Sequence, residues 1–224
     1  MKEFLSKVRI RVNEYVYLKD PESSKLGKRI LSHSIDMIDE MGFEAFTFRK
    51  LAKKIKSTEA SMYRYFENKH KLLLYLISWY WGWLEYRLVF GTANIEPPKT
   101  RLLRAITILT ESIKEDGGFA HINEVKLDRI VIAESSKVYL TKEVDEENQY
   151  GIFLGYKRIV GRVSDIILMI NPIYKYPHML ISTVIEGAHH QRYFAEHLPR
   201  LTDVVKDEDA IVEFYKDMVI KAIS

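Results

Sequence analysis

The chain has 224 residues, of which 47% are hydrophobic and 29% charged, proportions typical of a globular protein that can bury a core. It contains no cysteine, which excludes disulfides, thiolate metal sites and a cysteine nucleophile and fits a reducing cytoplasm. Charges interrupt the N-terminal residues, and no run approaches the roughly 18 apolar residues that span a membrane, so we expect neither a secretion signal nor a membrane helix.

The net charge is +3, but it is unevenly distributed. Residues 25–71 contain 11 Lys and Arg against 6 Asp and Glu, whereas residues 72–224 contain 18 against 21. A basic excess confined to one segment is typical of a domain that binds a polyanion. It also fits a solvated helical surface, so charge alone leaves both interpretations open.

Residues 1–24 form a leader ahead of the first helical pattern. Apolar and basic residues alternate over 8–12, which predicts a short strand or an extended arm. Pro21 breaks this segment, and Ser23 or Ser24 can cap the helix that follows. The pattern leaves open whether the leader contacts a bound polyanion, packs on the rest of the chain or stays free.

Apolar spacing predicts three helices in the next segment. The first is expected over about 25–41, with Gly42 directly after it as a C-cap residue. The second starts at Thr47, whose hydroxyl can cap free backbone N–H groups, and loses its apolar step after Ile55. The third is short, over about 59–65.

Further helices follow, and no segment alternates long enough to build a sheet. A long helix should begin after Asn68 and run to about Phe90. The later expected segments are 100–114, 123–137, 143–147 (a loop or a helix start), 152–170, 177–197 and 207–223. We therefore expect an all-α protein.

A helix pair joined by a tight turn and preceded by a third helix forms the trihelical helix-turn-helix, whose second paired helix enters the DNA major groove. A helix in that groove needs apolar anchors inward and polar groups outward. Met62 and Phe66, four residues apart, can supply the anchors. The residues left facing outward are Thr58, Glu59, Ser61 and Arg64.

Residues 42–73, GFEAFTFRKLAKKIKSTEASMYRYFENKHKLL, resemble the TetR/AcrR family of bacterial regulators. The shared features are a Gly-aromatic pair, a capping Thr, a Leu-Ala pair, a Tyr-x-Tyr-Phe run and a Lys ahead of two leucines. The resemblance covers the head, residues 25–71, and implies a larger helical dimerisation and effector body over 72–224. It also implies a homodimer that binds double-stranded DNA.

Two positions depart from the family pattern. Lys56 lies in the turn where a glycine would relax a positive φ angle, so the turn must be built differently or tolerate strain. Glu59 places a carboxylate near the groove. It can accept from a cytosine amino group or simply stabilise the N-terminus of its helix.

The resemblance implies roles for individual residues. Tyr63 and Lys69 match phosphate-contact positions, and Thr47 matches the point where the second helix meets the DNA backbone. Further candidates for bases or phosphates are Lys28, Arg49, Lys56, Thr58, Glu59, Ser61, Arg64 and His70.

The long helix after Asn68 is crowded with aromatic residues. Trp79, Trp83 and Tyr86 are candidates to line an effector pocket, and core packing or an interface is the alternative. Because three tryptophans within five positions cannot share one face, some of them must meet a partner, a pocket or water.

Glu186 and His189 have the i, i+3 spacing of di-iron carboxylate bundles, but no second pair of this kind occurs, so we expect no metal site and no cofactor. The resemblance makes 152–170 and 177–197 the candidate dimer-interface helices. No phosphate loop, nucleophile elbow or zinc spacing supports an enzyme.

The sequence thus predicts a cytoplasmic, homodimeric transcription regulator, a repressor that binds a palindrome and is released by an unidentified small molecule. Two alternatives remain. One is a helical-bundle metal or small-molecule binding protein with a vestigial head, and the other is a regulator controlled by a protein partner.

Overall fold

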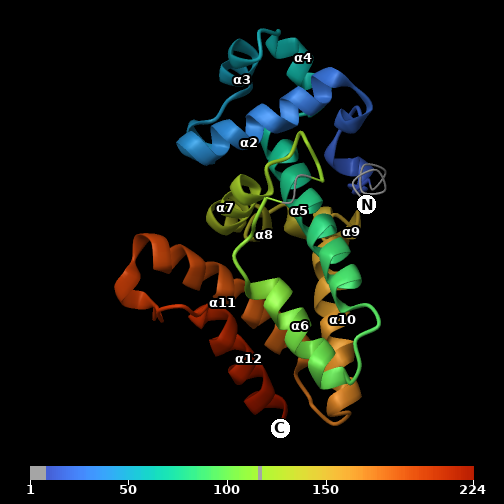
Figure 1. The fold of residues 1–224 in the computed structure, drawn as a ribbon. Coiled ribbons are helices and arrows are strands. Elements are labelled where there is room, and N and C mark those ends of the chain that lie inside the picture. Colours follow the sequence, from blue (N-terminus) through green and yellow to red (C-terminus); the bar gives the residue numbers. More distant parts are fainter. Residues whose placement is uncertain (1–8, 116–117) are drawn as a thin grey trace. The chain divides into compact units, whose positions relative to one another are not determined.

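The computed structural model of the chain describes residues 9–115 and 118–224 (Figure 1). All of its regular structure is helical, and no strand occurs within these residues. The strand or arm expected over 8–12 is not a strand at the four residues described, and Val8 lies outside the described part. The all-α expectation is confirmed.

The chain divides into two compact units. The first comprises residues 1–82 and 113–154, and the second comprises residues 83–112 and 155–224. The division falls within helix α5 (Lys69–Thr92), so its first part is described with the first unit.

Among the described residues, nine helical elements lie wholly or mainly in the first unit. They are η1 (Glu14–Val16), η2 (Pro21–Ser23), α2 (Lys25–Ala45), α3 (Phe48–Lys54), α4 (Glu59–Tyr63), α5, α7 (Glu124–Glu134), α8 (Ser136–Tyr139) and α9 (Val144–Gln149). In Figure 1, α3 and α4 lie side by side on one side of α2, and α7 lies on the other.

Short polar side chains begin the head helices, as the sequence predicts. Ser24, Thr47 and Thr58 accept hydrogen bonds from backbone N–H groups in the first turns of α2, α3 and α4. Asn68 does the same for α5, accepting from the backbone N–H of Lys71 at 2.9 Å. Each cap satisfies a donor that has no partner within its helix, which is worth about 1 kcal/mol.

Gly42 interrupts α2 near its end. Its φ of 76° is the left-handed conformation that glycine adopts at little cost, so the break falls where the sequence predicts. The break frees the backbone N–H of Phe43, which donates to Glu134 Oε1 at 2.9 Å. Arg129 forms a bidentate pair with Asp39, which precedes Gly42 on α2, so polar contacts fix α7 against α2.

The leader packs on the rest of the first unit. Asn13 Nδ2 donates to the carbonyl of Tyr150 at 2.8 Å, and the ring of Tyr15 stacks on that of Tyr150 at 4.3 Å. The backbone N–H of Leu18 donates to the carbonyl of Tyr65 at 2.8 Å. Residues 9–24 are therefore part of the folded unit.

The second unit contains the end of α5 and the helices α6 (Pro98–Thr110), α10 (Leu154–Ile170), α11 (Pro177–His197), η3 (Pro199–Leu201) and α12 (Ala210–Ile223). Both α11 and α12 pack on α6. The guanidinium of Arg192 joins them by donating to the carbonyl of Thr110 and to Asp209. Of the helices described, none combines the length and the apolar character needed to cross a membrane.

Candidate nucleic-acid interface

The turn between α3 and α4 is a Schellman motif. The backbone N–H of Ser57 donates to the carbonyl of Ala52 at 2.9 Å, and that of Lys56 donates to the carbonyl of Lys53 at 3.3 Å. Lys56 lies at the left-handed position with a φ of 51°. The chain thus keeps the turn geometry that glycine favours and tolerates the strain of a side chain there.

Helix α4 is anchored from inside. Met62 and Phe66 are fully buried, as are Leu51 and Ile55 of the preceding helix. Arg29 of α2 adds a hydrogen bond of 2.5 Å to the carbonyl of Ile55. The predicted outward residues Thr58, Glu59 and Arg64 are exposed, and Ser61 is partly exposed. The structure therefore brings the predicted reading residues to one surface.

Tyr63 is 48% exposed. Its ring packs edge-on against Phe48 at 5.2 Å, and its hydroxyl donates to Glu59 Oε1 at 3.5 Å. Glu59 is the first residue of α4, where a carboxylate also stabilises the helix N-terminus. Tyr63 thus has a fixed ring and a hydroxyl near the surface, as a phosphate contact requires.

Exposed cations lie on α3, in the turn after it and at the end of α4. Arg49, Lys56 and Arg64 are exposed, and so are three further lysines that were not among the predicted site residues. These are Lys50, Lys53 and Lys54 of α3. The signal that marks them is the run of basic residues between the buried positions of that helix.

Lys69 is engaged within the first unit. Its Nζ donates to the carbonyls of Phe43, Glu44 and Phe46 at 3.0, 3.2 and 3.4 Å, and it lies over the Phe43 ring. An ammonium group has three N–H donors, so these carbonyls use all of them. In this structure Lys69 caps the end of α2, a role that differs from the expected phosphate contact.

His70 is also engaged. Its Nε2 lies 3.0 Å from Oε1 of Glu147, a buried residue of α9, and Lys71 Nζ lies 3.4 Å from the same oxygen. The start of α5 is therefore tied to α9. Helix pattern alone does not reveal this partner, because Glu147 lies far along the chain.

The aromatic effector candidates lie in different environments. Trp79 and Trp83 are each only 1% exposed, whereas Tyr86 is partly exposed and packs against Phe90. Trp79 makes an edge contact with Phe119, and Arg87 lies over the Trp83 ring. A cavity of about 270 Å³ occurs elsewhere, beside the leader and Tyr75.

The predicted Glu186 and His189 pair does not form part of a metal cluster. Glu186 accepts a hydrogen bond from Tyr156 at 2.8 Å, and His189 is 8% exposed. Among residues 9–115 and 118–224, no group of three or more His, Cys, Asp or Glu side chains is arranged to hold a metal ion.

The predicted dimer helices carry exposed apolar side chains. Leu154 and Met169 of α10 are exposed, as are Met179 and Tyr193 of α11. Gly161 of α10 faces open space, so another helix can approach its backbone closely.

Residues 30–76 match the family model described as "Bacterial regulatory proteins, tetR family". The match covers most of α2, all of α3 and α4 with the turn between them, and the start of α5. The chain is also 25% identical over 92 residues to the uncharacterized HTH-type transcriptional regulator YuxN of Bacillus subtilis (strain 168). That match covers 41% of this chain but only 32% of the relative's length.

Three solved structures share the fold across most of the chain. The superantigen PfiT superposes with a TM-score of 0.58 at 16% identity, over 91% of this chain and 97% of that one. The ketosteroid transcriptional regulator KstR2 of Mycobacterium tuberculosis gives 0.52 at 13% identity, over 97% of each chain. AibR, in complex with isovaleryl coenzyme A and operator DNA, gives 0.53 at 16% identity, over 86% of this chain and 96% of that one.

Proposed function

We propose that the chain is a regulator of the TetR family, whose model its residues 30–76 match, and that it represses transcription by binding a palindromic operator as a homodimer. The proposal assigns DNA reading to residues 25–71 and dimerisation and effector binding to residues 72–224. It assigns no catalytic step, and it places the protein in the cytoplasm with the DNA.

The observation that carries the proposal is the surface built by α4 and the turn before it. Thr58, Glu59 and Arg64 are exposed on a helix whose opposite face is anchored by Met62, and exposed cations flank it. An exposed polar helix ringed by positive charge fits the major groove and the phosphates beside it.

We propose a division of labour within this surface. Ser61, Arg64, Thr58 and Glu59 read base edges, which specify sequence. Tyr63, Arg49, Lys56 and the N-terminus of α3 at Thr47 contact phosphates, which fix the register. Lys69 and His70 act by positioning, since their side chains hold the ends of α2 and α5.

We propose that the two heads of a dimer occupy successive major grooves, about 34–36 Å apart. The exposed apolar side chains of α10 and α11, with Gly161 between them, supply the surface for a second copy. Exposed apolar groups at helical spacing are typical of helix-on-helix interfaces.

We propose that a small-molecule effector releases the operator by binding the non-reading state more tightly. Support comes from the fold shared with a ketosteroid regulator and with a regulator that holds isovaleryl coenzyme A. Tyr86 is the accessible member of the aromatic set, whereas Trp79 and Trp83 become available only if the core around them opens.

The decisive experiment is selection of bound DNA from a random pool with the full chain, followed by affinity measurement over a range of salt. We expect a palindrome and a steep fall of affinity with salt, because each neutralised phosphate contributes a slope of about −0.9. Arg64→Ala should weaken binding about tenfold or more and relax the sequence preference. Lys175→Ala, an exposed cation of the second unit, is the matched control and should bind like the parent. Selection of no sequence, or equal effects of the two substitutions, would refute the proposal.

A further inference from the structure

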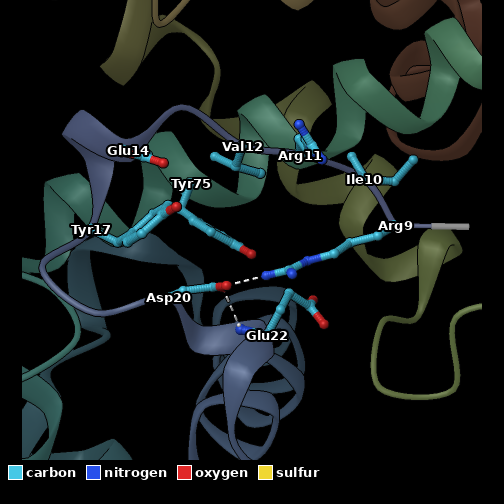
Figure 2. Close-up of a pocket in the computed structure, with 9 residues that line it drawn as sticks. All are labelled: Arg9, Ile10, Arg11, Val12, Glu14, Tyr17, Asp20, Glu22 and Tyr75. Atoms are coloured by element: carbon cyan, nitrogen blue, oxygen red, sulfur yellow. Dashed lines mark hydrogen bonds and ion pairs between the residues drawn. The ribbon is translucent and has the colours of Figure 1, made fainter.

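A cavity of about 270 Å³ lies between the leader and α5 within the first unit (Figure 2). It is just below the 300–1,000 Å³ typical of sites for drug-sized ligands, so it suits a smaller molecule. Its lining is mainly polar, with Ile10 and Val12 as the aliphatic members, and the phenols of Tyr17 and Tyr75 line it from the leader and from α5. The proposed DNA surface does not use this cavity.

Negative charge dominates the cavity. Its lining includes the carboxylates of Glu14, Asp20 and Glu22 against two guanidiniums, those of Arg9 and Arg11. Burial, together with the negative charges of Glu22 and Asp20, raises the pKa of the Tyr75 phenol above its ordinary value. Glu22 has other partners, since His121 Nε2 lies 2.6 Å from its Oε1 and Lys28 Nζ lies 3.9 Å from its Oε2, whereas Asp20 pairs with Arg9.

A cation from the chain itself already occupies this cavity. Figure 2 shows the Arg9 side chain extending through it, with the guanidinium paired to Asp20 Oδ2. The Arg9 side chain is nevertheless 59% exposed. Exposed ion pairs of this kind contribute little to stability, so an incoming cation can displace Arg9 at small cost.

The segment that forms the cavity wall also holds the end of the reading helix. Leu18 donates its backbone N–H to the carbonyl of Tyr65, and Ser24 Oγ lies 2.7 Å from the Tyr65 hydroxyl. Lys19 lies over the Tyr65 ring at 5.3 Å. Tyr65 is two residues beyond the end of α4. A ligand that shifts residues 9–22 therefore changes the support of α4.

We propose that this cavity binds a small organic cation, an amine or guanidine with a short apolar part, which displaces Arg9 from Asp20. The cation pairs with Asp20, its apolar part lies against Ile10 and Val12, and the rings of Tyr17 and Tyr75 face its charge. Binding reorders the leader and changes DNA affinity. This last step rests on the proposed function, whereas the binding step does not.

The binding step is tested by calorimetry on the full chain, without DNA. The probes are propylguanidinium and phenethylammonium, with 3-phenylpropionate as an anion of similar size. Arg9→Ala removes the resident competitor and should tighten binding of both cations about two- to fivefold. Asp20→Asn keeps the oxygen that accepts from the Glu22 N–H but loses the charge, and it should weaken binding about tenfold. Asp165→Asn, an exposed aspartate of the second unit, is the matched control.

The site is supported if both cations bind most tightly to Arg9→Ala and most weakly to Asp20→Asn, and if the anion does not bind. Absence of cation binding up to about 10 mM in both the parent chain and Arg9→Ala, or equal binding of the anion, overturns it. Circular dichroism and the unfolding midpoint verify that each variant is folded. If cations bind but leave DNA affinity unchanged, the link to α4 is overturned. A chain that binds cations but no DNA refutes the proposed function and leaves the cavity assignment intact.

Discussion

Replacing Lys69 with methionine should separate a folding role from a DNA contact. Methionine keeps most of the length of the side chain and its contact with the Phe43 ring, and it removes the ammonium. The carbonyls of Phe43, Glu44 and Phe46 then lose their shared donor at the point where Gly42 has already interrupted α2. The change therefore removes a charged cap from the end of that helix.

The expected loss follows from these contacts. A hydrogen bond to a charged donor contributes about 1.5–3 kcal/mol, and a cation at a helix C-terminus contributes about 0.3–1 kcal/mol. Lys69 is partly exposed, so water replaces some of the lost bonds. We expect the free energy of unfolding to fall by about 2 kcal/mol, most of it from the two shorter hydrogen bonds.

Two measurements decide the question. Urea unfolding followed by tryptophan fluorescence gives the stability, and DNA affinity over a range of salt gives the number of phosphates neutralised. We expect Lys69→Met to lose stability and to keep the salt slope of the parent, while Lys175→Met changes neither. A slope reduced in magnitude by about 0.9 with unchanged stability would show that Lys69 contacts a phosphate and that its capping role is incidental.

Three further substitutions test other parts of the structure. Lys56→Gly relieves the strain of a positive φ of 51° but gives the unfolded chain more freedom. We expect urea unfolding to show a net stabilisation of about 0.5–1 kcal/mol. A loss of stability would contradict the inference that Lys56 is strained. Gly187→Ala places a Cβ 2.3 Å from the Tyr215 hydroxyl, so α11 and α12 should separate and the free energy of unfolding should fall by about 1–3 kcal/mol. Adding Tyr215→Phe to the same chain should restore part of the lost stability. If it restores none, the clash lies elsewhere. Burial, reinforced by the neighbouring His190, lowers the pKa of His189 to about 4, below its ordinary value of 6.5. As pH falls the unfolded chain is protonated first, so stability is retained above pH 6.5, declines by about 3 kcal/mol towards pH 4 and then levels off. His189→Gln should flatten this decline in urea titrations across the range, and a parallel curve would rule out His189 as its source.

The local features of the head were predictable from sequence because they depend on neighbouring residues. Thr47 and Thr58 cap helices because their short polar side chains accept from free N–H groups in the next turn. Gly42 and Lys56 have positive φ angles at the points where helices break or end. Periodicity likewise separated the anchors, such as Met62, from the exposed residues of α4. Each of these inferences spans only a few positions.

The features that escaped prediction depend on contacts between distant segments. In the sequence Lys69 and His70 match phosphate-contact positions. In the fold Lys69 donates to carbonyls after Gly42, and His70 lies beside the carboxylate of Glu147. The sequence of the leader predicts a strand or an arm, but the backbone N–H of Leu18 donates to the carbonyl of Tyr65 and not to another strand. No spacing rule reveals such partners, because tertiary packing selects them.

The division of the chain has a consequence for synthesis. Because the first unit includes residues 113–154, Arg129 and Glu134 reach their partners on α2 only after that later stretch has left the ribosome. At roughly 5–20 residues per second, the about 70 residues after position 82 delay completion of the head by several seconds. During that interval the face of α2 that α7 covers is open to solvent and to chaperones. The proposed DNA-reading head, although early in the sequence, is therefore finished late, and under the proposed function premature operator binding by an incomplete chain is disfavoured.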